Sequence, residues 1–307
     1  MFSFFPLPSS FILMYLDIMQ KSPLLGTHVS VAGGVHTAFE RATRCGCATM
    51  QIFVKNANTW NARSLADADI ASYKTAAAGA SVAPVIAHAA YLINLCAISP
   101  ETLKKSIAGY EDELRRCEAL GVMGLVVHPG AHMGEGEDAG VKRIAESLNT
   151  IHARTKGFST FTLLEVTAGQ GTTIGYKLEH LRDIIGGLDE PGRAGICLDT
   201  CHAFAAGYDL RNDAGWERLM QDISATVGLE KLKAIHVNDS QKDFGSRRDR
   251  HEHIGKGMIG LEGFRFLMND PRFDAIPKIL ETEKSEDLHE DIENMDALRS
   301  LIRSTPA

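Results

Sequence analysis

Eight short apolar runs recur along this chain, and longer amphipathic segments separate them. In the segment 101–120, for example, apolar side chains recur at intervals of three and four residues, which predicts a helix. Eight strand–helix units in about 280 residues are typical of a (β/α)8 TIM barrel. We therefore predict a single α/β domain whose strands lie at 24–30, 49–54, 83–89, 124–130, 161–167, 195–200, 233–239 and 277–283.

An open, doubly wound sheet is the alternative architecture. Such a sheet usually has fewer units and carries a phosphate-binding glycine motif after its first strand. The stretch "GEGEDAG" at 134–140 has no strand directly before it, so we expect a loop there. The chain also contains no GxxxxGK[ST] motif and no internal repeat. These observations favour the closed barrel.

The first residues, "MFSFFPLPSSFILMYLDIMQK", differ from the rest of the chain. Their apolar part is interrupted by Asp17 and is too short to span a membrane. It also lacks the basic flank and the small-residue cleavage site of a secretory signal. We expect residues 1–23 to be a disordered extension or a misassigned start, with translation beginning at Met14 or Met19, and the barrel to occupy 24–307.

The overall charge argues mildly against nucleic acid as a partner. The formal net charge is −7, so the chain has no global basic field, although bound cations would change the balance locally. The six cysteines form no CxxC pair, which indicates buried, reduced thiols in a cytoplasmic protein. We further expect a monomer without membrane contact.

The last six apolar runs share a potential metal ligand at or near their C-terminal ends. Active sites of TIM barrels lie on that face, where the strand tips and the following loops meet. A single such residue is usually a satisfied core side chain, but six in succession are difficult to explain by packing. Without a cation, their desolvation would be costly. The six residues are His88, His128, Glu165, Asp199, His236 and Glu281.

Three further candidates follow in loops on the same face: His202, Asp249 and His251. Imidazole and carboxylate ligands without cysteine suit zinc, with manganese or iron as alternatives. Nine ligands are too many for one ion but suffice for three ions if one carboxylate bridges two of them. Adjacent metal ions activate water and stabilise the charge of a phosphodiester under attack, so this pattern indicates hydrolysis.

Eight segments together resemble the endonuclease IV family of abasic-site DNA repair enzymes. The resemblance extends from about residue 24 to the C-terminus, and the motifs occur in the family's order. The segments "DTCHAFAAGYD" and "DRHEHIGKG" are long and specific. The others are "LLGTHVSVAGG", "AHAAYLINL", "VVHPGAH", "LLEVTAGQG", "IHVNDS" and "ILETE".

The resemblance implies a xylose-isomerase-like barrel that holds three zinc ions. It implies base excision repair of double-stranded DNA, with abasic sites or blocked 3′ ends as substrates. Hydrolysis 5′ to the abasic site would leave a 3′-hydroxyl and a 5′-deoxyribose phosphate. Glu165 would bridge the first two ions and orient or deprotonate the attacking water. By the same resemblance, the ligand sets are His88, His128 and Glu165; Glu165, Asp199, His236 and Glu281; and His202, Asp249 and His251.

The resemblance also implies residues that contact DNA. Tyr91 matches a side chain that the family inserts beside the lesion, although a tyrosine there could simply pack on the next helix. Asn58 falls where some relatives insert an arginine, and Ala89 replaces an acidic residue of some relatives. Asn lacks the stacking and phosphate pairing of Arg, so it cannot replace the contacts of that arginine at the lesion. Backbone phosphates are the expected partners of Lys242, Arg247, Arg248 and Arg250, unless these side chains are merely solvated.

Two other functions compete with a repair nuclease. A sugar isomerase or epimerase on a related barrel would use Glu165, Asp199, His236 and Glu281, but it has no need for the closed triad of His202, Asp249 and His251. A DNA-lesion binder would hold its metals structurally. Structural zinc sites usually have four protein ligands and often use thiolates, so nine ligands for three ions favour catalysis over binding alone.

Overall fold

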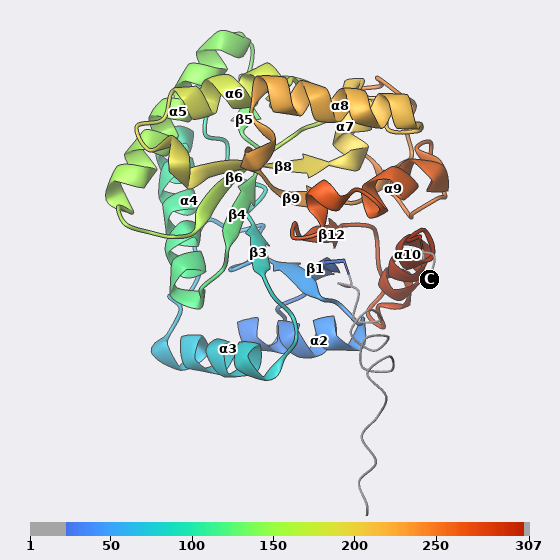
Figure 1. Ribbon diagram of the computed structural model, residues 1–307. Helices are drawn as coiled ribbons and strands as arrows, with labels where there is room; N and C mark the ends of the chain where they lie inside the picture. Colours follow the sequence, from blue (N-terminus) through green and yellow to red (C-terminus); the bar gives the residue numbers. More distant parts are fainter. Residues whose placement is uncertain (1–22, 304–307) are drawn as a thin grey trace, which may run out of the picture.

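Eight parallel strands close into a barrel with an unbroken ring of neighbours in the computed structural model, which describes residues 23–303 (Figure 1). Each predicted apolar run supplies one strand, so the predicted TIM barrel is confirmed. In chain order the strands are β1 (Leu25–Val29), β2 (Thr49–Ile52), β3 (Val85–His88), β4 (Gly124–Val127), β6 (Phe161–Glu165), β8 (Ala194–Asp199), β9 (Leu232–His236) and β12 (Lys278–Leu280).

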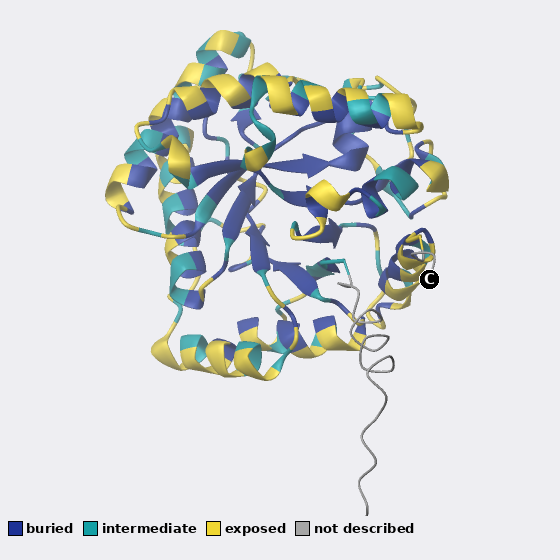
Figure 2. Cartoon of the chain, viewed as in Figure 1, coloured by how far each residue is buried: buried dark blue, intermediate teal, exposed yellow. Residues whose placement is uncertain are grey.

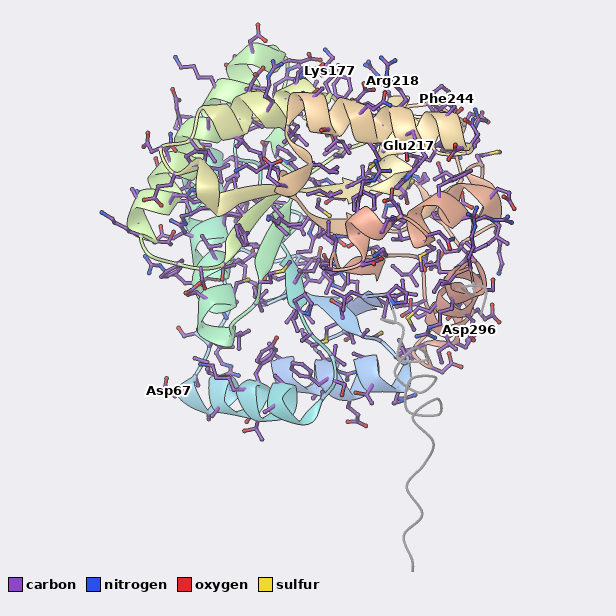
Figure 3. All side chains as sticks on the ribbon, viewed as in Figure 1. Asp67, Lys177, Glu217, Arg218, Phe244 and Asp296 are labelled. Atoms are coloured by element: carbon purple, nitrogen blue, oxygen red, sulfur yellow. The ribbon has the colours of Figure 1, made fainter. Side chains whose placement is uncertain are left out.

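Helices surround the barrel, and their buried faces cover the outside of the strands (Figure 2). Charged side chains labelled in Figure 3, such as Asp67, Arg218 and Asp296, lie at the periphery and are exposed. The helices of the ring are α2 (Ala38–Arg44), α3 (Asp67–Gly79), α4 (Pro100–Leu120), α5 (Glu137–Arg154), α6 (Leu178–Gly186), α8 (Asp213–Thr226), α9 (Gly260–Met268) and α10 (His289–Ser300). Shorter helical segments are α7 (Thr200–Ala206), η1 (Val35–Thr37), η2 (Pro191–Arg193), η3 (Leu229–Lys231) and η4 (Pro271–Phe273).

Helix α4 shows how local sequence sets these bounds. The Ser99 hydroxyl accepts a hydrogen bond from the Thr102 amide, and Pro100 occupies the first turn, where no amide donor is needed. The helix ends at Gly121, whose φ of 76° is left-handed and favours glycine. Between these caps, the Tyr110 hydroxyl donates to the Leu125 carbonyl and joins the helix to the barrel.

An apolar layer inside the barrel sets the height of the polar residues above it. Six of its strands each contribute one fully buried side chain to this layer: Ile86, Val126, Leu163, Cys197, Ala234 and Ile279. In every case the polar strand-tip residue predicted above follows two positions later. Residues two apart on a strand point to the same side, so an apolar floor lies directly beneath six potential ligands.

Two short antiparallel ladders at the mouth of the barrel were not predicted from sequence. One pairs β5 (Gly130–Ala131) with β7 (Thr173–Ile174), and the other pairs β10 (Asp239–Ser240) with β11 (His251–Glu252). The second ladder closes the loop of residues 241–250, which follows β9 in the chain. The loop expected at 134–140 is wrong in its second half, because α5 begins at Glu137.

Several smaller expectations are also resolved. All six cysteines are buried and unpaired, as predicted. Within residues 23–303, no helix is long and apolar enough to cross a membrane. Of residues 1–23 the structure describes only residue 23, so the expectation for this segment lies outside the described part of the chain.

The histidine of α5 predicts a measurable pH dependence of stability. His152 is buried and hydrogen-bonds Thr162, and burial together with the nearby Arg193 lowers its pKa to about 4. The folded state therefore keeps a neutral imidazole, whereas the unfolded chain protonates it near its ordinary pKa. This stability is present above that ordinary value and is lost as the pH falls toward 4. Between pH 7 and 5, wild type should lose about 2 kcal/mol more unfolding free energy than H152Q, measured by urea denaturation. Equal losses in the two proteins would contradict this assignment.

Candidate metal centre

Glu165 lies at the middle of the cluster on the barrel floor and contacts four imidazoles. Its side chain is fully buried at the end of β6. Oε1 lies 3.1 Å from both His202 Nδ1 and His236 Nδ1. Oε2 lies 3.2 Å from both His88 Nε2 and His128 Nε2. One carboxylate thus joins residues from four different parts of the barrel.

Asp199, His236 and Glu281 form a second group that shares Glu165. His236 Nδ1 lies 3.0 Å from Glu281 Oε2 and 3.9 Å from Asp199 Oδ2. Asn238 joins these two residues: its side-chain NH₂ donates to Asp199 Oδ2 over 2.7 Å, and its side-chain oxygen accepts from the Glu281 backbone amide over 2.8 Å. The Asp199 carboxylate also accepts a hydrogen bond from the His202 backbone amide at the start of α7, which couples the tip of β8 to the next ligand.

His202, Asp249 and His251 form the third group at the mouth of the barrel. His202 Nε2 lies 3.1 Å from Asp249 Oδ2, and His251 Nε2 lies 3.5 Å from Asp249 Oδ1. Both Nε2 atoms are buried, yet neither has a hydrogen-bond partner among the residues that the structure describes. Buried polar atoms are nearly always satisfied, so two orphaned nitrogens facing one carboxylate indicate a ligand between them.

The remote ring nitrogens are arranged as in metal-binding histidines. Such histidines usually bind a carbonyl or carboxylate through the nitrogen that faces away from the metal. Here, the Nδ1 atoms of His88, His202 and His251 lie 2.8, 3.1 and 3.2 Å from the carbonyls of Ala89, Val166 and Glu281. Each therefore donates from Nδ1 and leaves Nε2 free to bind a cation.

All nine side chains predicted as ligands come together on one face of the barrel. Their donor atoms form three groups, in each of which the atoms lie within 4.8 Å of one another. These groups have the same members as the three sets implied by the resemblance: His88, His128 and Glu165; Glu165, Asp199, His236 and Glu281; His202, Asp249 and His251. The donor set of imidazoles and carboxylates fits zinc.

Cys201 lies close enough to Asp199 and His251 to form an alternative group. Its thiol donates instead to the Arg250 carbonyl over 3.5 Å, and burial raises the pKa of the thiol to about 12. A protonated thiol is a poor ligand, which favours the sets without sulfur.

Mutual contacts control the charges of the cluster. Burial opposes ionisation of Glu165, but His128 and His236 outweigh it and hold its pKa well below the usual range. Burial likewise opposes protonation of His202, but Asp199 and Asp249 outweigh it and raise its pKa above the ordinary value. Since ligands bind cations in their deprotonated forms, metal binding here would release protons.

A cavity of about 770 Å³ opens above the cluster. It is lined by residues of all three groups and by the two lesion-contacting candidates, Tyr91 and Asn58. Tyr91 is 69% exposed, and its ring meets Phe53 edge-on at 5.5 Å, so it does not pack into the next helix. Asn58 is exposed on the same cavity. The structure therefore places both side chains where a bound molecule would meet them.

The four basic candidates line a separate pocket of about 470 Å³ together with Gln170 and Ser246. Arg247, Arg248 and Arg250 lie on its exposed side, and the Arg247 guanidinium lies 4.5 Å from the centre of the Tyr176 ring. Lys242 is half-buried in the same pocket. Asp249 lies between Arg248 and Arg250 in the sequence, so one loop contributes both to the basic pocket and to the third ligand group.

Sequence reasoning missed two polar residues that hold the ligands. Asn238 hydrogen-bonds the Asp199 carboxylate and the Glu281 backbone, and Gln51 on β2 contacts His236 and Glu281. For Gln51, the available signal was a polar residue inside an apolar run.

The fold and the cluster define a TIM barrel with a cluster of potential metal ligands on its C-terminal face. Residues 39–303 match the family described as xylose isomerase-like TIM barrel. The chain is 44% identical to the probable endonuclease 4 of Citrifermentans bemidjiense over 91% of this chain and 99% of the relative. It also matches the crystal structure of endonuclease IV from Thermus thermophilus, with 35% identity, a TM-score of 0.81 and coverage of 91% and 98% of the two chains.

The chain belongs to the endonuclease IV family, a family of hydrolytic enzymes within the xylose isomerase-like barrels. Similar folds also occur in proteins outside this family. The 3-keto-D-glucoside 4-epimerase YcjR of E. coli matches with a TM-score of 0.64 over 91% of this chain and 100% of its own, but at only 18% identity. That similarity shows a shared fold alone.

Proposed function

We propose that this protein is a DNA repair endonuclease that hydrolyses the phosphodiester 5′ to abasic sites during base excision repair. The observation that carries the proposal is the third ligand group, in which His202 Nε2 and His251 Nε2 are buried beside Asp249 without a hydrogen bond from any described residue. Together with the two groups that share Glu165, it supports a site for three zinc ions, with manganese or iron as alternatives at some positions. A repair role in turn implies a cytoplasmic enzyme, and we expect it to act as a monomer.

When bound, the ions would polarise the attacking water and stabilise negative charge on the phosphate. The reaction adds water across the O3′–P bond, so the upstream strand keeps a 3′-hydroxyl and the downstream strand keeps a 5′-deoxyribose phosphate. Glu165 is the candidate for orienting or deprotonating that water, because it is the carboxylate common to the first two groups. The apolar layer beneath the cluster excludes bulk water and strengthens these interactions.

DNA would approach from the cavity side. Tyr91 lines this cavity and would stack beside the lesion, where stacking on one base contributes about 1–3 kcal/mol. Lys242, Arg247, Arg248 and Arg250 would contact backbone phosphates and position the duplex, and blocked 3′ ends would enter the same site. Asn58 offers only an amide at the position where relatives insert an arginine, so we expect Tyr91 to contribute more to lesion recognition than Asn58.

A sugar epimerase is the strongest alternative, because its ligand set would need only the second group. That function leaves the orphaned nitrogens of His202 and His251 without explanation. A DNA-lesion binder without turnover would use the same surface, but it would not need ligands shared between groups.

Incision of a defined duplex tests the proposal. The zinc-loaded protein should cut a duplex containing one tetrahydrofuran abasic analogue directly 5′ to the analogue, and the new end should be extended by a DNA polymerase. An undamaged duplex of the same sequence should remain intact. Binding without cutting would support the lesion binder and contradict the nuclease. Epimerisation of ketoses by a protein that leaves DNA intact would support the sugar epimerase and also contradict the nuclease.

Removing basic side chains should weaken DNA binding through its salt dependence. The double variant R247A/R248A is expected to make the negative slope of log K against log salt concentration shallower by about 2, because each lost phosphate contact reduces its magnitude by about 1. Its kcat at saturating DNA should be unchanged. R218A, which removes an exposed arginine from α8, is the matched control and should keep the wild-type slope. An unchanged slope in the double variant would show that the loop is merely solvated.

A further inference from the structure

Gln51 is a fully buried amide in the middle of β2, a strand that supplies none of the nine predicted ligands. A buried amide is costly unless its donors and acceptor are satisfied. Three contacts satisfy this one. Oε1 lies 2.8 Å from His236 Nε2, and Nε2 lies 2.5 Å from Glu281 Oε1 and 3.0 Å from His28 Nδ1.

The Glu281 carboxylate fixes which way the amide faces. If the amide were turned over, its oxygen would lie against the Glu281 oxygen, and two acceptors would repel each other. The NH₂ group of Gln51 therefore donates to Glu281 and His28, and its oxygen faces His236.

This orientation determines the tautomer of His236. The Gln51 oxygen can only accept, so the hydrogen of the neutral imidazole lies on Nε2. The lone pair of Nδ1 is then directed into the second group, where Nδ1 lies 3.1 Å from Glu165 Oε1 and 3.0 Å from Glu281 Oε2. One amide thus orients two ligands of the same group.

We propose that Gln51 is a positioning residue that sets the cation affinity of the second group, which consists of Glu165, Asp199, His236 and Glu281. The inference rests on the proposed metal-dependent function and deepens it. His88, His202 and His251 are oriented by backbone carbonyls, which a side-chain substitution does not remove. His236 is oriented by the side chain of Gln51, so a substitution of Gln51 can remove this orienting contact while His236 itself stays unchanged.

The prediction concerns zinc affinity rather than activity. Loss of an outer partner of this kind typically weakens metal binding about 10- to 100-fold. Gln51→Met keeps the length of the side chain without its hydrogen bonds, and Gln51→Asn keeps the amide but shortens its reach. In both variants one of three zinc equivalents should bind about 10- to 100-fold more weakly, while the other two keep wild-type affinity. The readout is competition with a chromophoric zinc chelator, with the bound zinc counted by elemental analysis.

Thr162→Val is the matched control for a merely structural effect. It removes a buried hydrogen bond from the barrel strand β6, between Thr162 and His152, without touching a predicted ligand. This variant should bind all three equivalents as wild type does. Selective weakening of one equivalent in both Gln51 variants supports the proposal. Wild-type affinity for all three, or a parallel loss of all three that Thr162→Val reproduces, would overturn it.

The same titration separates this proposal from the function on which it rests. If the wild-type protein itself binds no zinc, the metal-dependent function fails. If wild type binds three equivalents and the Gln51 variants bind them equally well, only the positioning role fails.

Discussion

The substitution Glu165→Gln is expected to reduce kcat/KM for abasic-site incision at least about a thousand-fold, because it removes the charge shared by two ligand groups. A thousand-fold loss corresponds to about 4 kcal/mol of transition-state stabilisation, within the several kcal/mol that metal-ion catalysis supplies. The amide has nearly the same shape as the carboxylate, so packing on the barrel floor changes little. Its NH₂ group, however, would face imidazole nitrogens that now lie 3.1–3.2 Å from carboxylate oxygens.

Single-turnover kinetics with excess enzyme is the appropriate measurement, combined with zinc analysis of the same sample. Glu137→Gln provides a matched control. The Glu137 carboxylate also contacts a histidine, His180, over 3.1 Å, but it lies on α5 away from the three ligand groups. It should incise at the wild-type rate. An E165Q variant with more than about a tenth of wild-type kcat/KM would refute the central role of Glu165, since such a loss amounts to at most about 1.4 kcal/mol.

Replacing His202 or His251 with alanine should remove about one equivalent of zinc and lower incision at least about a hundred-fold, with the fold intact. Both side chains belong to the group at the barrel mouth, where His202 is 2% exposed and His251 is half-buried. Loss of a ligand at such a site is local, because the strands beneath it are held by their own ladder and apolar layer. The other two groups keep all their members, and they lose only the contact that His202 makes with Glu165.

Elemental analysis after gel filtration gives the stoichiometry, and circular dichroism checks the fold. His289→Ala is the control, because His289 lies with Asp287 and Glu290 in an exposed group of potential ligands outside the barrel mouth. That variant should retain all of its zinc. Three equivalents retained by both H202A and H251A would remove these residues from the predicted ligand set.

The barrel and the first six candidate ligands could be predicted from the sequence because both follow from local periodicity. An apolar run followed by His or an acid needs no knowledge of distant residues, and closure of the barrel brings all such strand tips together. Thus Glu165 and Glu281, which are far apart in the chain, both contact His236.

Residues that depend on tertiary contacts were harder to predict. Asp249 and His251 are positioned by the short β10–β11 ladder and by Gln170, whose side chain accepts a hydrogen bond from the Asp249 backbone amide over 3.1 Å. Neither feature has a local signal, and their grouping with His202 came from the resemblance. Gln51 interrupts an apolar run, but its partners lie on β9 and after β12, so its role appears only in the folded chain.

Stepwise reconstitution with zinc tests the central claim most directly. The protein is first stripped with a chelator, checked for retained secondary structure, and then titrated with zinc while incision of an abasic duplex and bound zinc are followed together. The account predicts no incision by the stripped protein and a rise in activity that ends at three bound equivalents per chain. Full activity without zinc, or activity that saturates at one equivalent, would contradict the proposal that these nine side chains form a three-metal nuclease site.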